Sequence, residues 1–154
     1  MTSSKLLIRQ LEQSYQAQAW HGPNLKGALR GLKPKQLLWR PAKKRHNIWE
    51  LAVHCAYWKY VVKRRITGDK RGSFPLQGSN WFTVNGGTAS DWRHDLRFIN
   101  LMHNDLISAV KKMKPAQLNR KDGKYTFADL ILGAASHDVY HAGQIQLLKK
   151  LQGK

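Results

Sequence analysis

Residues 126–151 read TFADLILGAASHDVYHAGQIQLLKKL, and this stretch decides the fold. It contains no proline, and its apolar residues recur at the three- and four-residue spacings of a helix. Thr126 can cap its start, with Asp129 where a capping box usually carries Glu or Gln, and Gly153 follows its end. The pattern predicts one long helix over residues 126–151.

Two histidines on this helix are the first candidates for a functional site. Residues four apart share a helix face, so His137 and His141 present two imidazoles side by side. Two neutral imidazoles at this spacing make half of a metal site, which a ligand from another helix would complete. Two surface or partner-bound histidines would give the same pattern. Gln144 on the same face is a candidate catalytic residue that orients a water or substrate, or else a buried amide that satisfies the backbone.

Three earlier stretches also have helical periodicity: residues 3–19, 47–67 and 90–113. The first runs into Trp20-His21-Gly22-Pro23, which predicts a break, because Gly followed by Pro interrupts a helix. His21 at this break is either a candidate catalytic residue that points into a pocket or a histidine that fills the kink.

The helix predicted over residues 47–67 carries the third candidate ligand. Asn47 is a good cap, and Gly68 stops the helix. His54 lies among apolar and aromatic neighbours, where either a metal ligand or a packed core histidine would lie. Cys55 points about 100° away from His54 and is expected to be a small core residue. His103 in the next helix is a secondary candidate for the pocket, or else a bundle histidine with one hydrogen-bond partner.

The connections predict how the helices are arranged. Residues 33–46 form a basic connection with a short turn, residues 69–89 form a long link rich in Gly, Ser, Pro and Asn, and residues 119–124 form a polar turn. The long link can cross the length of a bundle, and its aromatic residues predict that it packs down like a lid. The sequence therefore predicts one all-α domain over residues 1–154, a four-helix bundle with up-down-down-up order and a long crossover between helices 2 and 3.

Composition narrows the functional classes. The 154 residues, 42% of them hydrophobic, suit a single domain with a core. The single cysteine excludes an intrachain disulfide, and no apolar run approaches the roughly eighteen residues that span a membrane. The N-terminus has no signal-peptide core. We expect a soluble, cytoplasmic protein with no membrane partner.

Charge is the unusual feature, with 27 Lys and Arg against 9 Asp and Glu and a net charge of +18. Such a field attracts nucleic acids and other polyanions. Residues 26–45 are the densest basic stretch, and such a run is most often a solvated loop. No nucleic-acid-reading motif accompanies the charge. A basic nucleic-acid or polyanion-binding bundle is therefore one alternative function.

Three features together resemble the DinB-like superfamily, which includes YfiT-type metal-dependent hydrolases. They are Glu50-Leu51-Ala52-Val53-His54, the long crossover, and His137-Asp138-Val139-Tyr140-His141-Ala142-Gly143-Gln144-Ile145. The resemblance covers nearly the whole chain. It implies that His54, His137 and His141 bind a divalent ion such as Zn²⁺ or Ni²⁺, and that the protein is a homodimer. It also implies a small-molecule substrate, acted on by hydrolysis or by transfer with a low-molecular-weight thiol. A catalytically inactive bundle is a further alternative.

The chain lacks an evident carboxylate base. Its His-Asp-x-x-His differs from the zinc-protease His-Glu-x-x-His because Asp is one methylene shorter, so Asp138 is expected to face solvent or to support a ligand from behind. The candidates for a base are His21, a water on the ion, or the substrate, with His46 as a further pocket residue. The +18 charge is not part of the family pattern.

Overall fold

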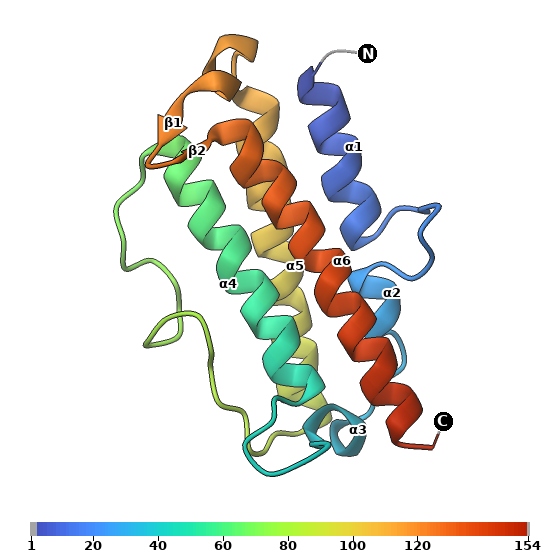
Figure 1. Ribbon diagram of the computed structural model, residues 1–154. Coiled ribbons are helices and arrows are strands. Elements are labelled where there is room, and N and C mark those ends of the chain that lie inside the picture. Colours follow the sequence, from blue (N-terminus) through green and yellow to red (C-terminus); the bar gives the residue numbers. More distant parts are fainter. Residues whose placement is uncertain (1–2, 154) are drawn as a thin grey trace.

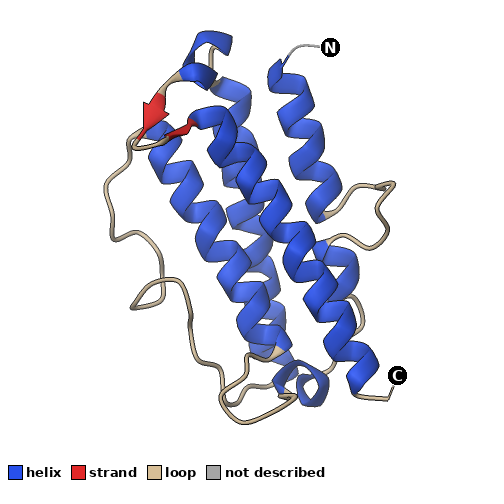
Figure 2. Ribbon diagram, in the orientation of Figure 1, coloured by secondary structure: helices blue, strands red, loops and turns tan. Residues whose placement is uncertain are grey.

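The computed structural model describes residues 3–153, and its regular structure is mostly helical (Figure 2). Its elements are α1 (Ser3–Tyr15), α2 (Leu25–Leu29), α3 (Pro34–Leu38), α4 (Ile48–Thr67), α5 (Ala89–Lys112), the 3-10 helix η1 (Pro115–Asn119), β1 (Lys121–Asp122), β2 (Tyr125–Thr126) and α6 (Phe127–Leu151). The two strands form a small antiparallel hairpin between α5 and α6. Within the described residues, no helix combines the length and the apolar character needed to cross a membrane.

The four long helices lie side by side as a bundle. Followed along the chain in Figure 1, α1 and α6 run in one direction, and α4 and α5 run in the other. The parallel pair α4 and α5 is joined by the long link, which passes along the outside of the bundle. An all-α fold with this helix order is what the connection lengths predict.

Helix starts follow the local capping signals. Thr126 caps α6 by accepting a hydrogen bond from the Asp129 N–H, and the Asp129 carboxylate accepts one from the Thr126 N–H. This reciprocal capping box confirms the predicted start. The start of α5 differs slightly from the expected Ser90, because Thr88 forms the capping box with Asp91 and the helix begins at Ala89.

The first helix is shorter than predicted, ending at Tyr15 rather than at residue 19. The Ala17 N–H bonds to the Glu12 carbonyl instead of continuing the helical ladder, and the Asn24 amide donates to the Ala17 carbonyl. The chain then forms α2 after the expected break, and both α1 and α2 pack against α6. The predicted interruption is confirmed, but it begins earlier.

The link between α4 and α5 packs onto the bundle, as its aromatic residues predict. Phe82 is buried, and Phe74 packs against it with ring centroids 5.2 Å apart. The buried Glu50 carboxylate accepts hydrogen bonds from the Val84 N–H and from the Arg40 guanidinium. A Cβ at Gly87 would lie 2.5 Å from the Trp49 ring, so only glycine allows the link to pass this close to α4.

The bundle interior consists of two hydrophobic clusters with a polar layer between them. One cluster gathers the start of α4 and the end of α6, and the other gathers the end of α4 and the start of α6. The layer between them contains the following buried residues: Lys59, His103, Asp138 and His141. A polar layer in the middle of a bundle is the place where facing helices can build a site.

Candidate metal centre

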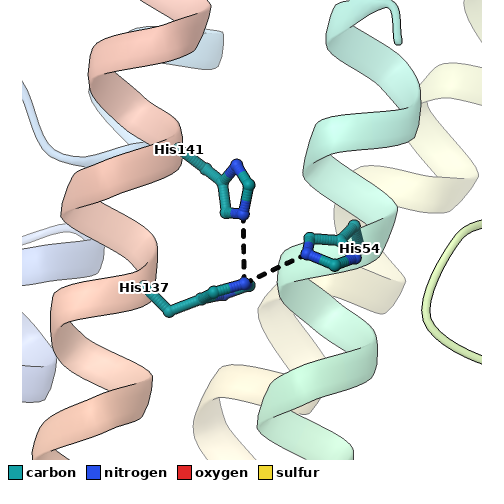
Figure 3. A group of neighbouring side chains, drawn as sticks. All are labelled: His54, His137 and His141. Carbon is teal, nitrogen blue, oxygen red and sulfur yellow. Dashed lines mark hydrogen bonds between the residues drawn. The ribbon is translucent and has the colours of Figure 1, made fainter.

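Three histidine side chains converge between α4 and α6. Figure 3 shows His54 on α4 pointing toward His137 and His141 on α6. The His137 Nε2 atom lies 3.1 Å from the His54 Nε2 and 3.0 Å from the His141 Nε2. His54 and His141 are buried, and His137 is partly exposed. The structure therefore brings together the three residues that the sequence analysis proposes as ligands.

Hydrogen bonds on the far side of two rings fix their tautomers. The His54 Nδ1 lies 2.7 Å from the Asn80 carbonyl oxygen, and the His141 Nδ1 lies 2.6 Å from the Gln144 Oε1. Both partners are acceptors, so each Nδ1 carries the hydrogen and donates it. The Nε2 atoms of His54 and His141 therefore point unprotonated lone pairs toward the centre of the cluster.

This arrangement suits a cation. The His137 Nε2 can carry one hydrogen and donate it to only one of the two neighbouring lone pairs, so the other lone pair faces a nitrogen about 3 Å away with no hydrogen between them. A zinc ion with Zn–N distances of about 2.0–2.1 Å and a near-tetrahedral angle would hold its ligand nitrogens roughly 3.3 Å apart. The observed spacings therefore need only a small expansion to fit one ion.

Burial keeps the three imidazoles neutral at pH 7. It lowers the pKa of His54 to about 4, against the opposing effect of the hydrogen bond to Asn80. Burial, reinforced by the two neighbouring imidazoles, lowers the pKa of His137 to about 3, and burial also lowers the pKa of His141. Neutral imidazole is the form that binds metal, so protons do not compete for these nitrogens near neutral pH.

Aromatic rings from the link and from α4 cover the cluster. The Trp81 indole stacks on His54 at 3.8 Å and on His46 at 3.6 Å between ring centroids. The indole lies between these imidazoles, because two rings stacked on the same face at these distances would overlap. Trp58 contacts His54 edge-on and donates its indole hydrogen to the Asn80 side chain. The lid-like link thus supplies part of the site itself.

His46 lies outside the histidine cluster, because the Trp81 indole separates it from His54. Its Nδ1 donates a hydrogen bond to the Glu50 carboxylate, 3.1 Å away. Glu50 itself is not available as a base. Burial alone would raise its pKa, but hydrogen bonds from Arg40, the Val84 N–H and His46 outweigh burial and lower the pKa to about 2.

The two sequence-based catalytic candidates lie in different places. His21 is exposed and lines a small cavity with Ala135 and Val139, on the face of α6 opposite to His137 and His141. It does not belong to the histidine cluster. The Gln144 Oε1 accepts the hydrogen bond from the His141 Nδ1, so this oxygen positions a ligand ring from behind.

Asp138 does not face solvent. It is fully buried, and its Oδ2 lies 2.7 Å from the Lys59 Nζ, which is also buried. The Lys59 ammonium lies 4.1 Å from the Tyr15 ring centroid, a cation–π contact. Burial raises the pKa of Asp138 to about 6, although the nearby Lys59 acts in the opposite direction.

The sequence analysis overlooked Lys59 as a buried residue, although a signal was available. Lys59 follows Cys55 by four residues and precedes Val62 by three, so it occupies a core position of the helix. Asp138 holds the equivalent position on α6, between Ala134 and Ala142. Opposite charges at core positions of two neighbouring helices predict a buried ion pair.

Cys55 and His103 lie deeper in the bundle. Cys55 is completely buried, as expected, and burial raises the pKa of its thiol well above the usual value, so it is not a thiolate nucleophile. His103 stacks on Tyr15 at 4.1 Å, and neither ring nitrogen has a hydrogen-bond partner within the described residues. The expected hydrogen-bond partner of His103 is therefore not found in this part of the chain. The Glu12 Oε2 lies 3.6 Å from the His103 Nε2, slightly beyond hydrogen-bond distance.

Comparison with known proteins gives a family but no relative. A family model described as the DinB superfamily matches residues 18–145, which cover most of the chain and include the three clustered histidines. Neither a curated protein nor a solved structure matches the chain.

Proposed function

This chain belongs to the DinB superfamily, and on that premise we propose that it is a metal-dependent enzyme acting on a small molecule. His54, His137 and His141 bind one divalent ion, with Zn²⁺ or Ni²⁺ the ions best suited to imidazole ligands. The observation that carries the proposal is the convergence of three Nε2 atoms, two of them with fixed lone pairs. Three protein ligands leave a coordination position for water or substrate, as in catalytic rather than structural sites.

Such an ion, when bound, lowers the pKa of a water or a thiol that it holds, and so supports hydrolysis or thiol transfer. The residues of this chain orient and enclose the site. Asn80 and Gln144 fix two ligand rings, and Trp81 shields one side from water. Because Cys55 is buried and protonated, a reacting thiol must come from a substrate.

Activity that depends on the metal tests this proposal. Protein loaded with Zn²⁺ or Ni²⁺ is compared with metal-stripped protein on a panel of carboxylic and phosphate esters, and on conjugation of small thiols to an electrophile. We expect turnover in one of the two panels that is lost on stripping and recovered on adding the ion back. A metal-loaded protein without turnover in either panel would contradict the enzymatic part of the proposal and favour an inactive bundle.

Gln144→Ala is expected to lower metal affinity by about 10- to 100-fold, the usual effect of removing a hydrogen bond that orients a ligating histidine. Gln144 is only half-buried, so the melting temperature should change little. Competition with a chromophoric chelator gives the affinity. Gln146→Ala, also half-buried on α6, is the matched control. Equal affinities for both variants and the unmodified protein would refute the positioning role.

A further inference from the structure

A large cleft lies beside the histidine cluster, between α4 and the first half of the link. Its volume is about 1120 Å³, slightly above the range of about 300–1,000 Å³ that is usual for small-molecule sites. The floor is formed by residues of α4 from Tyr57 to Arg65, and one rim is formed by the hairpin residues 120–122. A cleft of this size has room for an elongated organic molecule.

The cleft carries an excess of positive charge. Its lining includes two carboxylates, Asp69 and Asp122, and each of these is already paired, with Lys63 and Arg65 respectively. The remaining cationic residues of the lining form no ion pair within residues 3–153: Arg64, Arg71, Arg120 and Lys121. Several uncompensated cations along a concave surface focus the potential and attract an anion.

One end of the cleft reaches the histidine cluster. Trp58 lines the cleft and contacts both His54 and His137 edge-on, with ring centroids 6.4 and 6.3 Å apart. Arg64 lies six residues further along α4, which corresponds to about 9 Å of helix. A ligand of this length would place one end beside Trp58 and its charged end among the arginines.

We propose that this cleft binds the charged end of the substrate, and that the substrate is an elongated organic anion with at least two negative charges. The assignment of the ligand as substrate rests on the proposed function, whereas the anion site itself does not. Arg64 and Arg71 contribute hydrogen-bonded charge from the floor and the link, and Arg120 and Lys121 contribute it from the hairpin. Part of the +18 charge thereby acquires a role at the site.

Binding of naphthalene-1,5-disulfonate, a rigid aromatic dianion and a poor metal ligand, tests the anion site. Equilibrium dialysis at low salt is expected to give one bound dianion per chain. Arg64→Ala with Arg71→Ala should weaken binding at least tenfold, because two charged contacts are lost. Arg120→Ala with Lys121→Ala, on the opposite rim, should also weaken dianion binding. This second double variant tests the site if the first one fails to fold.

The matched control is Lys5→Ala with Arg9→Ala, which removes the same charge from the exposed face of α1, across the bundle from α4 (Figure 1). Its binding should remain within twofold of the unmodified protein. No binding, or equal weakening by control and cleft variants, would overturn the site and assign any attraction to the general surface charge.

Metal binding and dianion binding, measured separately on the unmodified protein, separate this inference from the proposed function. If the unmodified protein holds metal but not the dianion, the anion site is wrong and the proposed function stands. If it holds the dianion but no metal, the proposed function fails, the substrate assignment falls with it, and the anion site stands.

Discussion

Replacing His137 by alanine is expected to lower the affinity for Zn²⁺ or Ni²⁺ by more than 100-fold. The Nε2 of His137 is the nitrogen that lies close to both others, so its removal leaves two donors on different helices. Removing a group that merely orients a ligating histidine costs about 10- to 100-fold, and the loss of a ligand should exceed that. His137 makes no other side-chain hydrogen bond within residues 3–153, so the fold should persist.

Competition with a chelator measures this affinity, and thermal unfolding of the metal-free proteins checks the fold. His21→Ala is the matched control, because it removes an exposed histidine that lies outside the cluster. The control should bind metal as tightly as the unmodified protein. Metal affinity that is unchanged in His137→Ala, or equally reduced in His21→Ala, would exclude the three-histidine site.

Asp138→Ala is expected to destabilise the protein by about 3–5 kcal/mol, because it leaves the buried Lys59 ammonium without its counter-charge. Both side chains are only 1% exposed, so water cannot replace the lost partner without opening the bundle. Chemical denaturation of metal-free protein gives the free energy of unfolding and keeps metal binding out of the comparison.

The double variant Lys59→Met with Asp138→Val separates the charge from the packing. Replacing both members of a buried pair by apolar residues is often neutral or stabilising, so the double variant should recover most of the lost stability. A double variant as unstable as Asp138→Ala would show that packing, not the unpaired charge, determines the loss. A small effect of Asp138→Ala alone would show that water reaches Lys59.

Much of the fold follows from local signals in the sequence. Local residues determine both ends of α4, through Asn47 with Glu50 and through Gly68, and they determine the start of α6 through Thr126 with Asp129. The histidine cluster was predictable because the i,i+4 spacing of His137 and His141 fixes their common face. The addition of His54 depended on the family resemblance, since its apolar surroundings also suit a core histidine.

Features that depend on how segments meet in space were not predictable in the same way. The link residues Asn80 and Trp81 complete the site because the link folds back onto α4, and no periodicity encodes that path. His21 was misplaced because α1 ends at Tyr15, and the following turn faces the far side of α6. The Lys59 and Asp138 pair was overlooked because charged residue types suggest a solvent-exposed position, although the helical spacing of both residues indicates the core.

The metal content of protein purified without a histidine tag tests the central claim most directly. The protein is loaded with Zn²⁺ or Ni²⁺, desalted, and analysed by inductively coupled plasma mass spectrometry together with a determination of protein concentration. A site built from His54, His137 and His141 predicts one tightly held ion per chain. Retention of no ion, or of the same amount by a protein lacking all three histidines, would contradict it.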